Sequence, residues 1–185
     1  ERIDPETGLP AFDTPQQLRD YDGRRPRTGL LSCISIHAAP TPQTAKVITD
    51  SLADGGTACR WQGLDIVVIR RAASPGEAFV WAEGVCSRLA AASVGLTWFR
   101  AQDFHETAIN QSEHALRLAI FRGGGVCTWQ TVACLEVARR VGASNADPRA
   151  KRDAFLAELA GSLGPVQREQ LTTHSEEVAG AAHSL

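Results

Sequence analysis

The sequence predicts an α/β fold in which helices cover a single sheet and a helical extension follows. Three observations lead to this prediction. Segments with the apolar spacing of helices alternate with short strand-like apolar segments. Two strand-like segments adjoin in the middle of the chain, and only helical spacing is present near the C-terminus. We therefore expect a sheet domain over residues 1–129 and a helical extension over residues 130–185.

The predicted helices of the sheet domain begin at capping residues. A hydroxyl side chain followed by proline marks the start of three helices, because the hydroxyl caps the helix and proline suits its first position. These pairs are Thr14–Pro15, Thr41–Pro42 and Ser74–Pro75, with Gln17 and Glu77 completing capping boxes in the first and third. Gly55 and Gly56 are expected to end the second helix. A fourth helix is predicted over about 109–121, before a run of three glycines.

Short apolar segments predict the strands. They cover residues 29–37, 60–69, 94–99 and 126–129. The second of them reads RWQGLDIVVI, with Asp65 between two apolar runs, and this pattern predicts a hairpin. In the extension, helices are predicted over 132–141, 148–163 and 166–182.

Composition narrows the class of function. The chain has 185 residues and a formal net charge of −2, so it lacks the basic excess typical of nucleic-acid binding. No apolar run approaches the roughly 20 residues of a membrane span, and no signal peptide opens the chain. The five cysteines have no CxxC spacing, which argues against a zinc site or a disulfide framework. We expect a reduced, cytoplasmic protein, and we interpret the absence of methionine as a sign of a longer parent chain.

Four motifs in this order resemble the GGDEF domain of bacterial diguanylate cyclases. Asp4 to Phe12 is similar to the entry motif D-x-L-T-G-L-x-N-R, and Arg60 to Ile66 is similar to R-x-G-G-D-E-F. Ser93 to Thr97 resembles S-x-G-x-A, and Gln111 to Gly123 resembles the last helix, A-D-x-A-L-Y-x-A-K-x-x-G. The resemblance covers roughly residues 3–128. It implies a cyclase-like, mostly antiparallel central sheet flanked by helices.

The departures from this family fall at the positions that carry its chemistry. The resemblance implies two divalent cations on the substrate triphosphate, held by carboxylates of a D-x-D strand and of the GGDEF turn. Here the strand reads Ile34-Ser35-Ile36-His37, so Ser35 replaces the metal-binding aspartate and His37 the second one. Leu64 replaces the carboxylate of the turn, and Asp65 alone remains. Serine and leucine do not bind a hard dication as two carboxylates do.

Other substrate positions also differ from the family pattern. Gln62 replaces the first glycine of the turn, while Gly63 keeps the second. Ile120 replaces the lysine that meets the triphosphate. The segment that reads guanine is missing after His37. We therefore predict no catalytic residue, no metal ligand and no cofactor, with Mg²⁺ required only if some activity is retained.

Three functions follow from this resemblance. The first is a catalytically inactive GGDEF-like module of a cyclic-dinucleotide signalling protein, which acts through homodimerisation or a protein partner. The second is a sensor that binds GTP or cyclic di-GMP, with Arg60, Asp65 and Arg122 as polar remnants. The third is a divergent nucleotide cyclase with Asp65, Asp103 or Glu106 as replacement ligands.

Three further features keep two interpretations each. Gln167 to Ala179 resembles the first helix of HD-type (HD-GYP) phosphodiesterase domains. An amphipathic helix that packs on the domain or pairs with a second copy is the favoured interpretation, and His174 is not proposed as a ligand. Asp103, His105 and Glu106 are interpreted as a solvated helix start rather than a metal site. Residues 24–27 are interpreted as a solvated basic loop. Trp61, Trp98 and Trp129 are expected to lie in the core or in an interface, and Trp61, beside the turn, is the one to check for exposure.

Overall fold

The computed structural model describes residues 2–24, 27–52, 55–103 and 105–163. The chain forms two compact units, residues 1–128 and residues 129–185. In the described part of the first unit the strands are β1 Ala11–Phe12, β2 Leu30–His37, β3 Thr57–Trp61, β4 Asp65–Arg71, β5 Ser93–Arg100 and β6 Gly125–Thr128. Its helices are α1 Pro15–Asp22, α2 Pro42–Asp50, α3 Pro75–Arg88 and α4 His105–Phe121.

The strands form one sheet in the order β1-β3-β4-β2-β5-β6. The central pairs β3–β4, β4–β2 and β2–β5 are antiparallel, whereas β1 and β6 pair in parallel at the two edges. This confirms the predicted mostly antiparallel sheet and the hairpin. The two-residue strand β1 was not predicted, because a segment this short has no measurable apolar period.

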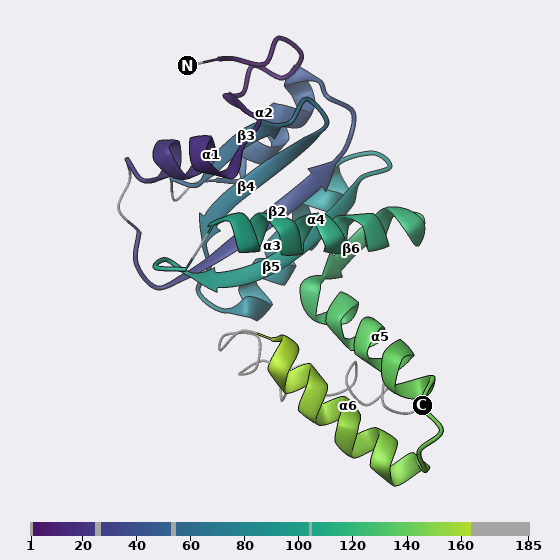
Figure 1. Cartoon of the computed structure of the whole chain (residues 1–185). Helices are drawn as coiled ribbons and strands as arrows, with labels where there is room; N and C mark the ends of the chain where they lie inside the picture. The colour runs from purple at the N-terminus through teal and green to yellow at the C-terminus, as the bar shows by residue number, and fades with distance from the viewer. Residues whose placement is uncertain (1, 25–26, 53–54, 104, 164–185) are drawn as a thin grey trace. The chain divides into compact units, whose positions relative to one another are not determined.

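The helices cover both faces of the sheet, with α1 and α4 on one face and α2 and α3 on the other (Figure 1). Strand residues alternate between the two faces. On the first face, Cys33, Cys59 and Val67 from the strands form one buried cluster with Leu18 of α1 and Ile109 of α4. The face under α4 therefore also contains every second residue of β2, including Ser35 and His37.

Local caps fix the helix starts largely as predicted. Thr14 and Gln17 form a complete capping box, and the hydroxyl of Thr41 caps α2. Ser74 caps α3, but the predicted box is incomplete, because the carboxylate of Glu77 binds the guanidinium of Arg70. A buried cation competes better for this carboxylate than a backbone amide at the helix start.

Three predicted boundaries were wrong. The second helix ends at Asp50 rather than at Gly55, because its capping residue Ser51 binds two side chains of α3: its carbonyl oxygen accepts from Trp81 and its hydroxyl from Arg88. The fourth helix begins at His105, not near residue 109, and Trp129 starts a helix rather than ending a strand.

Gly95 of β5 allows the close packing of α4 on the sheet. A Cβ atom at this position would lie 2.1 Å from the carbonyl oxygen of Ser112 and 2.2 Å from the amide nitrogen of Leu116. Both are backbone atoms of α4, so a side chain at Gly95 would displace the helix. This contact accounts for the glycine in the Ser93 to Thr97 motif.

The second unit contains α5 Trp129–Gly142 and α6 Pro148–Ser162, capped by Asp147. These helices share a buried cluster that includes Val137, Phe155 and Leu159. The HD-like segment Gln167 to Ala179 and the predicted helix 166–182 lie outside the described residues. None of the described helices is both long and apolar enough to cross a membrane.

Candidate functional site

The turn between β3 and β4 has a left-handed backbone conformation at its two central residues. Gln62 has a φ of 52° and Gly63 a φ of 68°, and the amide of Leu64 donates to the carbonyl oxygen of Trp61 at 3.0 Å. Positive φ at both central residues is typical of the tight turns that join two antiparallel strands. A glutamine in this conformation is strained relative to glycine. Its side chain compensates in part by donating to the carbonyl oxygen of Asp13 at 3.1 Å.

Two of the predicted site residues lie together at this turn. His37, the last residue of β2, donates from Nδ1 to Oδ1 of Asp65, the first residue of β4, at 2.8 Å. The imidazole is 55% exposed and the carboxylate 21% exposed. Hydrogen bonding to a carboxylate orients an imidazole. The carboxylate of Asp65 is therefore engaged by the imidazole of His37.

Ser35 is fully buried and its hydroxyl is engaged within the core. Its Oγ lies 2.8 Å from Oγ of Ser112 on α4. The Ser112 hydroxyl donates to the carbonyl oxygen of Ile109 at 2.9 Å. A hydroxyl has one proton to donate, so Ser35 is the donor in the bond between the two serines. The position that the resemblance aligns with a metal-binding aspartate therefore contains a buried pair of small hydroxyl side chains.

The other replaced positions face solvent. Leu64 is 67% exposed at the turn, and Ile120 is 46% exposed in the last turn of α4. Leucine and isoleucine have no atom that binds a cation or a phosphate. These two residues offer apolar surface at the turn and in the last turn of α4.

The three residues predicted as nucleotide contacts are not brought together. Trp61 lies under α4, because its indole nitrogen donates to Oε1 of Glu113 at 2.8 Å, and Asp65 pairs with it across the hairpin. Arg60 precedes Trp61 in the strand and therefore points to the opposite face. The guanidinium of Arg122 lies 3.9 Å from Sγ of Cys127 in β6, and β6 is three strands from β4, about 14 Å at the usual strand spacing.

Trp61 is buried, in agreement with its interpretation as a core or interface aromatic residue. The bond to Glu113 explains this, because it satisfies the indole N–H and lets the ring join the core. Nothing in the sequence placed Glu113 opposite Trp61, which is 52 residues away.

A buried polar cluster around Asp22 was also not predicted. The carboxylate of Asp22 accepts from Oγ1 of Thr57 at 2.7 Å, pairs with Arg27 at 2.9 Å and lies 3.3 Å from Nε2 of His105. The interpretation of Arg27 as part of a solvated loop was therefore wrong; residues 25 and 26 lie outside the described residues. Burial alone would raise the pKa of Asp22, but the bonds from His105 and Thr57 and the charge of Arg27 together hold it below its usual value.

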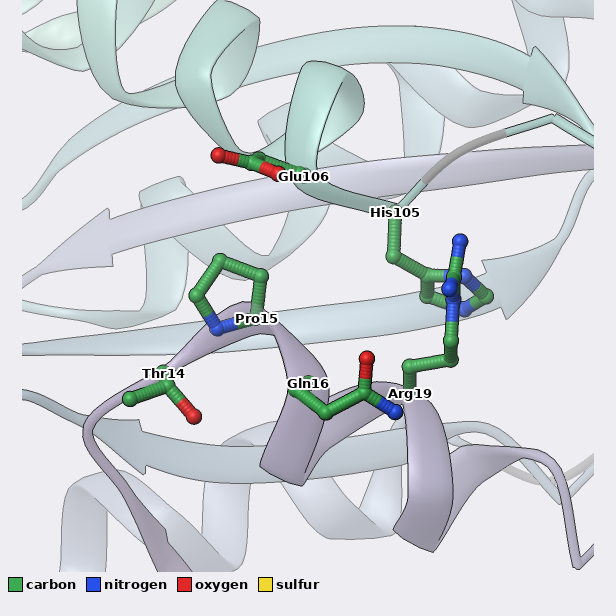
Figure 2. Close-up of a pocket in the computed structure, with 6 residues that line it drawn as sticks. All are labelled: Thr14, Pro15, Gln16, Arg19, His105 and Glu106. Carbon is green, nitrogen blue, oxygen red and sulfur yellow. The ribbon is translucent and has the colours of Figure 1, made fainter.

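The three candidate metal ligands near residue 105 have different surroundings in the structure. His105 is engaged with Asp22, and the carboxylate of Asp103 accepts from the backbone amide of Arg100 at 3.1 Å. Glu106 borders a cavity of about 170 Å³, where His105 and Glu106 of α4 face Gln16 and Arg19 of α1 (Figure 2). Within the described part of the chain, no group of three or more metal-ligating side chains converges.

Cys33 and Cys59, the two cysteines on this face of the sheet, do not supply a nucleophile. Burial raises the pKa of the Cys33 thiol to about 12 and also raises that of Cys59. Both thiols are protonated at neutral pH, and a protonated thiol is a poor nucleophile. The described chemistry at the turn is therefore limited to the His37–Asp65 pair.

Comparison with known proteins identifies the architecture. No family model matches the chain, and no curated protein matches its sequence. Among solved structures, it is similar to the GGDEF domain of FimX from Pseudomonas aeruginosa, with 14% identity and a TM-score of 0.53 over 69% of this chain and 99% of that one. It is also similar to the GGDEF domain of TpbB (YfiN) from the same organism, with 17% identity and a TM-score of 0.53 over 69% and 94% of the two chains.

A third similar structure is the GGDEF domain of DgcB from Caulobacter crescentus, solved in complex with c-di-GMP. It shares 12% identity, with a TM-score of 0.53 over 69% of this chain and 95% of that one. These three structures match at low identity and nearly full length, so the likeness establishes the architecture. The chain described here has the fold of a GGDEF domain.

Proposed function

We propose that this chain is a GGDEF-like module of a bacterial cyclic di-GMP signalling protein that has lost diguanylate cyclase activity. One observation carries the proposal. Ser35 stands where the resemblance implies a metal-binding aspartate, and it is buried and hydrogen-bonded to Ser112. An added cation would find neither an open position nor a carboxylate there.

The second ligand position supports the same conclusion independently. Leu64 is exposed, so space for a cation exists at the turn, but its side chain has no oxygen to offer. Asp65 retains a carboxylate, yet its Oδ1 is bonded to His37. A single carboxylate is a weak site for Mg²⁺, which is usually held by carboxylates together with substrate phosphates.

Metal binding in solution tests this loss directly. Titration of the nucleotide-free protein with Mn²⁺, followed by electron paramagnetic resonance of the free ion, is expected to show no tight site. The matched variant is Leu64→Asp, which restores one carboxylate at an exposed position. Tight Mn²⁺ binding to the unmodified protein would contradict the proposed loss.

We further propose that the module acts through self-association or a protein partner in the cytoplasm. The replaced positions Leu64 and Ile120 are apolar and exposed, a property more typical of a contact surface than of a phosphate site. Sedimentation equilibrium is expected to show a concentration-dependent dimer that Leu64→Asp weakens. A strictly monomeric protein without any captured partner would leave this proposal without support.

A nucleotide sensor is the second candidate function. It is motivated by the structure of the DgcB domain, which was solved with c-di-GMP, and by the polar residues Arg60, Asp65 and Arg122. Calorimetric titration with GTP and with cyclic di-GMP separates the two functions. Heat of binding with either ligand favours the sensor, and its absence favours the interaction module.

A further inference from the structure

The cavity between α1 and α4 is lined by polar side chains of both charges. Its volume is about 170 Å³. The lining consists of Thr14, Pro15, Gln16, Arg19, His105 and Glu106. Figure 2 shows the carboxylate of Glu106 and the guanidinium of Arg19 at separate ends of this group of residues. A molecule in the cavity would therefore meet one anionic and one cationic group.

The imidazole of His105 is held in one orientation by a buried carboxylate. Its Nε2 lies 3.3 Å from Oδ2 of Asp22, whose side chain is only 4% exposed and also pairs with Arg27. A hydrogen bond to a carboxylate fixes the tautomer of an imidazole and places the proton on the bonded nitrogen. The neutral ring then has an acceptor at Nδ1. The ring that lines the cavity therefore carries its acceptor at a fixed position.

Gln16 adds a second acceptor. Its Nε2 donates to Oδ1 of Asp20 at 2.7 Å, which leaves the side-chain oxygen for other partners. Figure 2 shows this oxygen directed toward α4. Together with the carboxylate of Glu106 and Nδ1 of His105, it supplies acceptors for the N–H groups of a primary ammonium. Arg19 complements them, because a guanidinium binds a carboxylate through two parallel hydrogen bonds.

The volume of the cavity limits the size of its ligand. An engineered cavity of about 150 Å³ accommodates benzene, a molecule of about six non-hydrogen atoms. Alanine has the same number of non-hydrogen atoms. A cavity of about 170 Å³ therefore fits a molecule of this size but not a nucleotide.

We infer that the cavity between α1 and α4 binds a small α-amino acid of the size of alanine as its zwitterion. Arg19 binds the carboxylate, while Glu106, Gln16 and His105 accept from the ammonium group. Each charge of the ligand thus meets an opposite charge, which offsets its desolvation. The inference goes beyond the proposed loss of cyclase activity and does not rest on it, since the cavity shares no lining residue with the turn between β3 and β4.

Ligand binding to the full chain tests this inference. Isothermal titration calorimetry measures L-alanine and two analogues that each lack one end of it: L-lactate has no ammonium group, and L-alaninamide has no carboxylate. We expect saturable binding of L-alanine. Both analogues should bind more weakly by about tenfold or more, because each leaves one charged side chain of the cavity unpaired.

Two substitutions with matched controls locate the site. Arg19→Gln and Glu106→Gln remove the two charges that line the cavity, and each should weaken L-alanine binding by about tenfold or more. Arg117→Gln and Glu83→Gln remove the same charges from exposed positions outside the cavity, so the affinity should stay unchanged.

The affinities decide between the outcomes. The inference is overturned if L-alanine shows no saturable binding at millimolar concentrations, or if L-lactate or L-alaninamide binds as tightly as L-alanine. It is equally overturned if Arg19→Gln and Glu106→Gln both keep the affinity of the unmodified protein. The measurements with the analogues use the unmodified chain, so they decide the question even where a variant does not fold.

Discussion

Restoring the carboxylate at position 35 is the most informative perturbation of the candidate site. In the present core, Ser35 donates to Ser112, whose own proton is used by the carbonyl oxygen of Ile109. In Ser35→Asp an ionised carboxylate has no proton to donate. It would face the acceptor lone pairs of Ser112 unless that hydroxyl gives up its bond to Ile109. The introduced carboxyl group can take the place of the serine only in its protonated form.

The free-energy cost of keeping this group protonated can be estimated. An aspartate in an unfolded chain has a pKa of about 3.9, so protonation at pH 7 requires a rise of about three pKa units, or about 4 kcal/mol. The extra volume adds a further cost of about 1–3 kcal/mol in a packed core. Ser35→Ala is the control, because it loses only the bond to Ser112, about 1 kcal/mol.

The pH dependence gives a second signature of the same reasoning. Because the folded-state pKa of the introduced group is raised, its ionisation penalty is absent below the unfolded pKa and grows as the pH rises above it. Urea unfolding followed by tryptophan fluorescence at pH 7.0 and at pH 4.5 measures the difference between Ser35→Asp and Ser35→Ala. We expect a difference above about 4 kcal/mol at pH 7.0 that falls by about 3 kcal/mol at pH 4.5. Equal stability of the two variants at pH 7.0 would refute a filled position at Ser35.

Three further predictions concern the surroundings of the site. Gly95→Ala should lower the free energy of unfolding by about 3 kcal/mol or more, because its Cβ would overlap the α4 backbone. The control is Gly84→Ala in α3, whose Cβ meets nothing within 4 Å and which should raise the free energy of unfolding by up to about 1 kcal/mol. Urea unfolding compares the two variants. Asp22→Asn should cost about 3–5 kcal/mol at pH 7. Since the pKa of Asp22 is lowered in the folded state, the part of this cost that depends on ionisation is complete above the unfolded pKa of about 4 and is lost as the pH falls through the folded value. Acid titration of both proteins by circular dichroism checks it, and a pH-independent difference would count against the cluster. Gln62→Gly should be more stable than Gln62→Ala by about 1 kcal/mol, because position 62 has a positive φ that favours glycine. Thermal unfolding of the two variants compares them.

Local chemistry explains why much of the fold was predictable. Thr14, Thr41 and Ser74 each cap a helix within three residues of themselves, so the signal lies in adjacent sequence. The hairpin was equally clear, because its two strands are joined by three residues. Boundaries set by distant contacts were missed. The end of α2 depends on Trp81, which is 30 residues from the carbonyl oxygen it binds.

The candidate site shows the same division between local and distant information. The replacements at Ser35 and Leu64 are visible in the sequence, since a family motif assigns their positions. The hydrogen bond between Ser35 and Ser112 could not be predicted from the sequence, because the two residues are 77 positions apart. The residue type gives no help, since serine occurs both in the core and at the surface. That the buried Arg60 has no counter-ion among the described residues also required the structure, since this depends on all of its neighbours together.

Product formation from GTP is the measurement that tests the proposed loss of activity most directly. The protein is incubated with GTP and either Mg²⁺ or Mn²⁺, and cyclic di-GMP is measured by liquid chromatography beside an active diguanylate cyclase. The filled position at Ser35 and the apolar residue at Leu64 predict no product above a protein-free control with either ion. Formation of cyclic di-GMP at a rate comparable to the active enzyme would contradict the proposal and require metal ligands other than those positions.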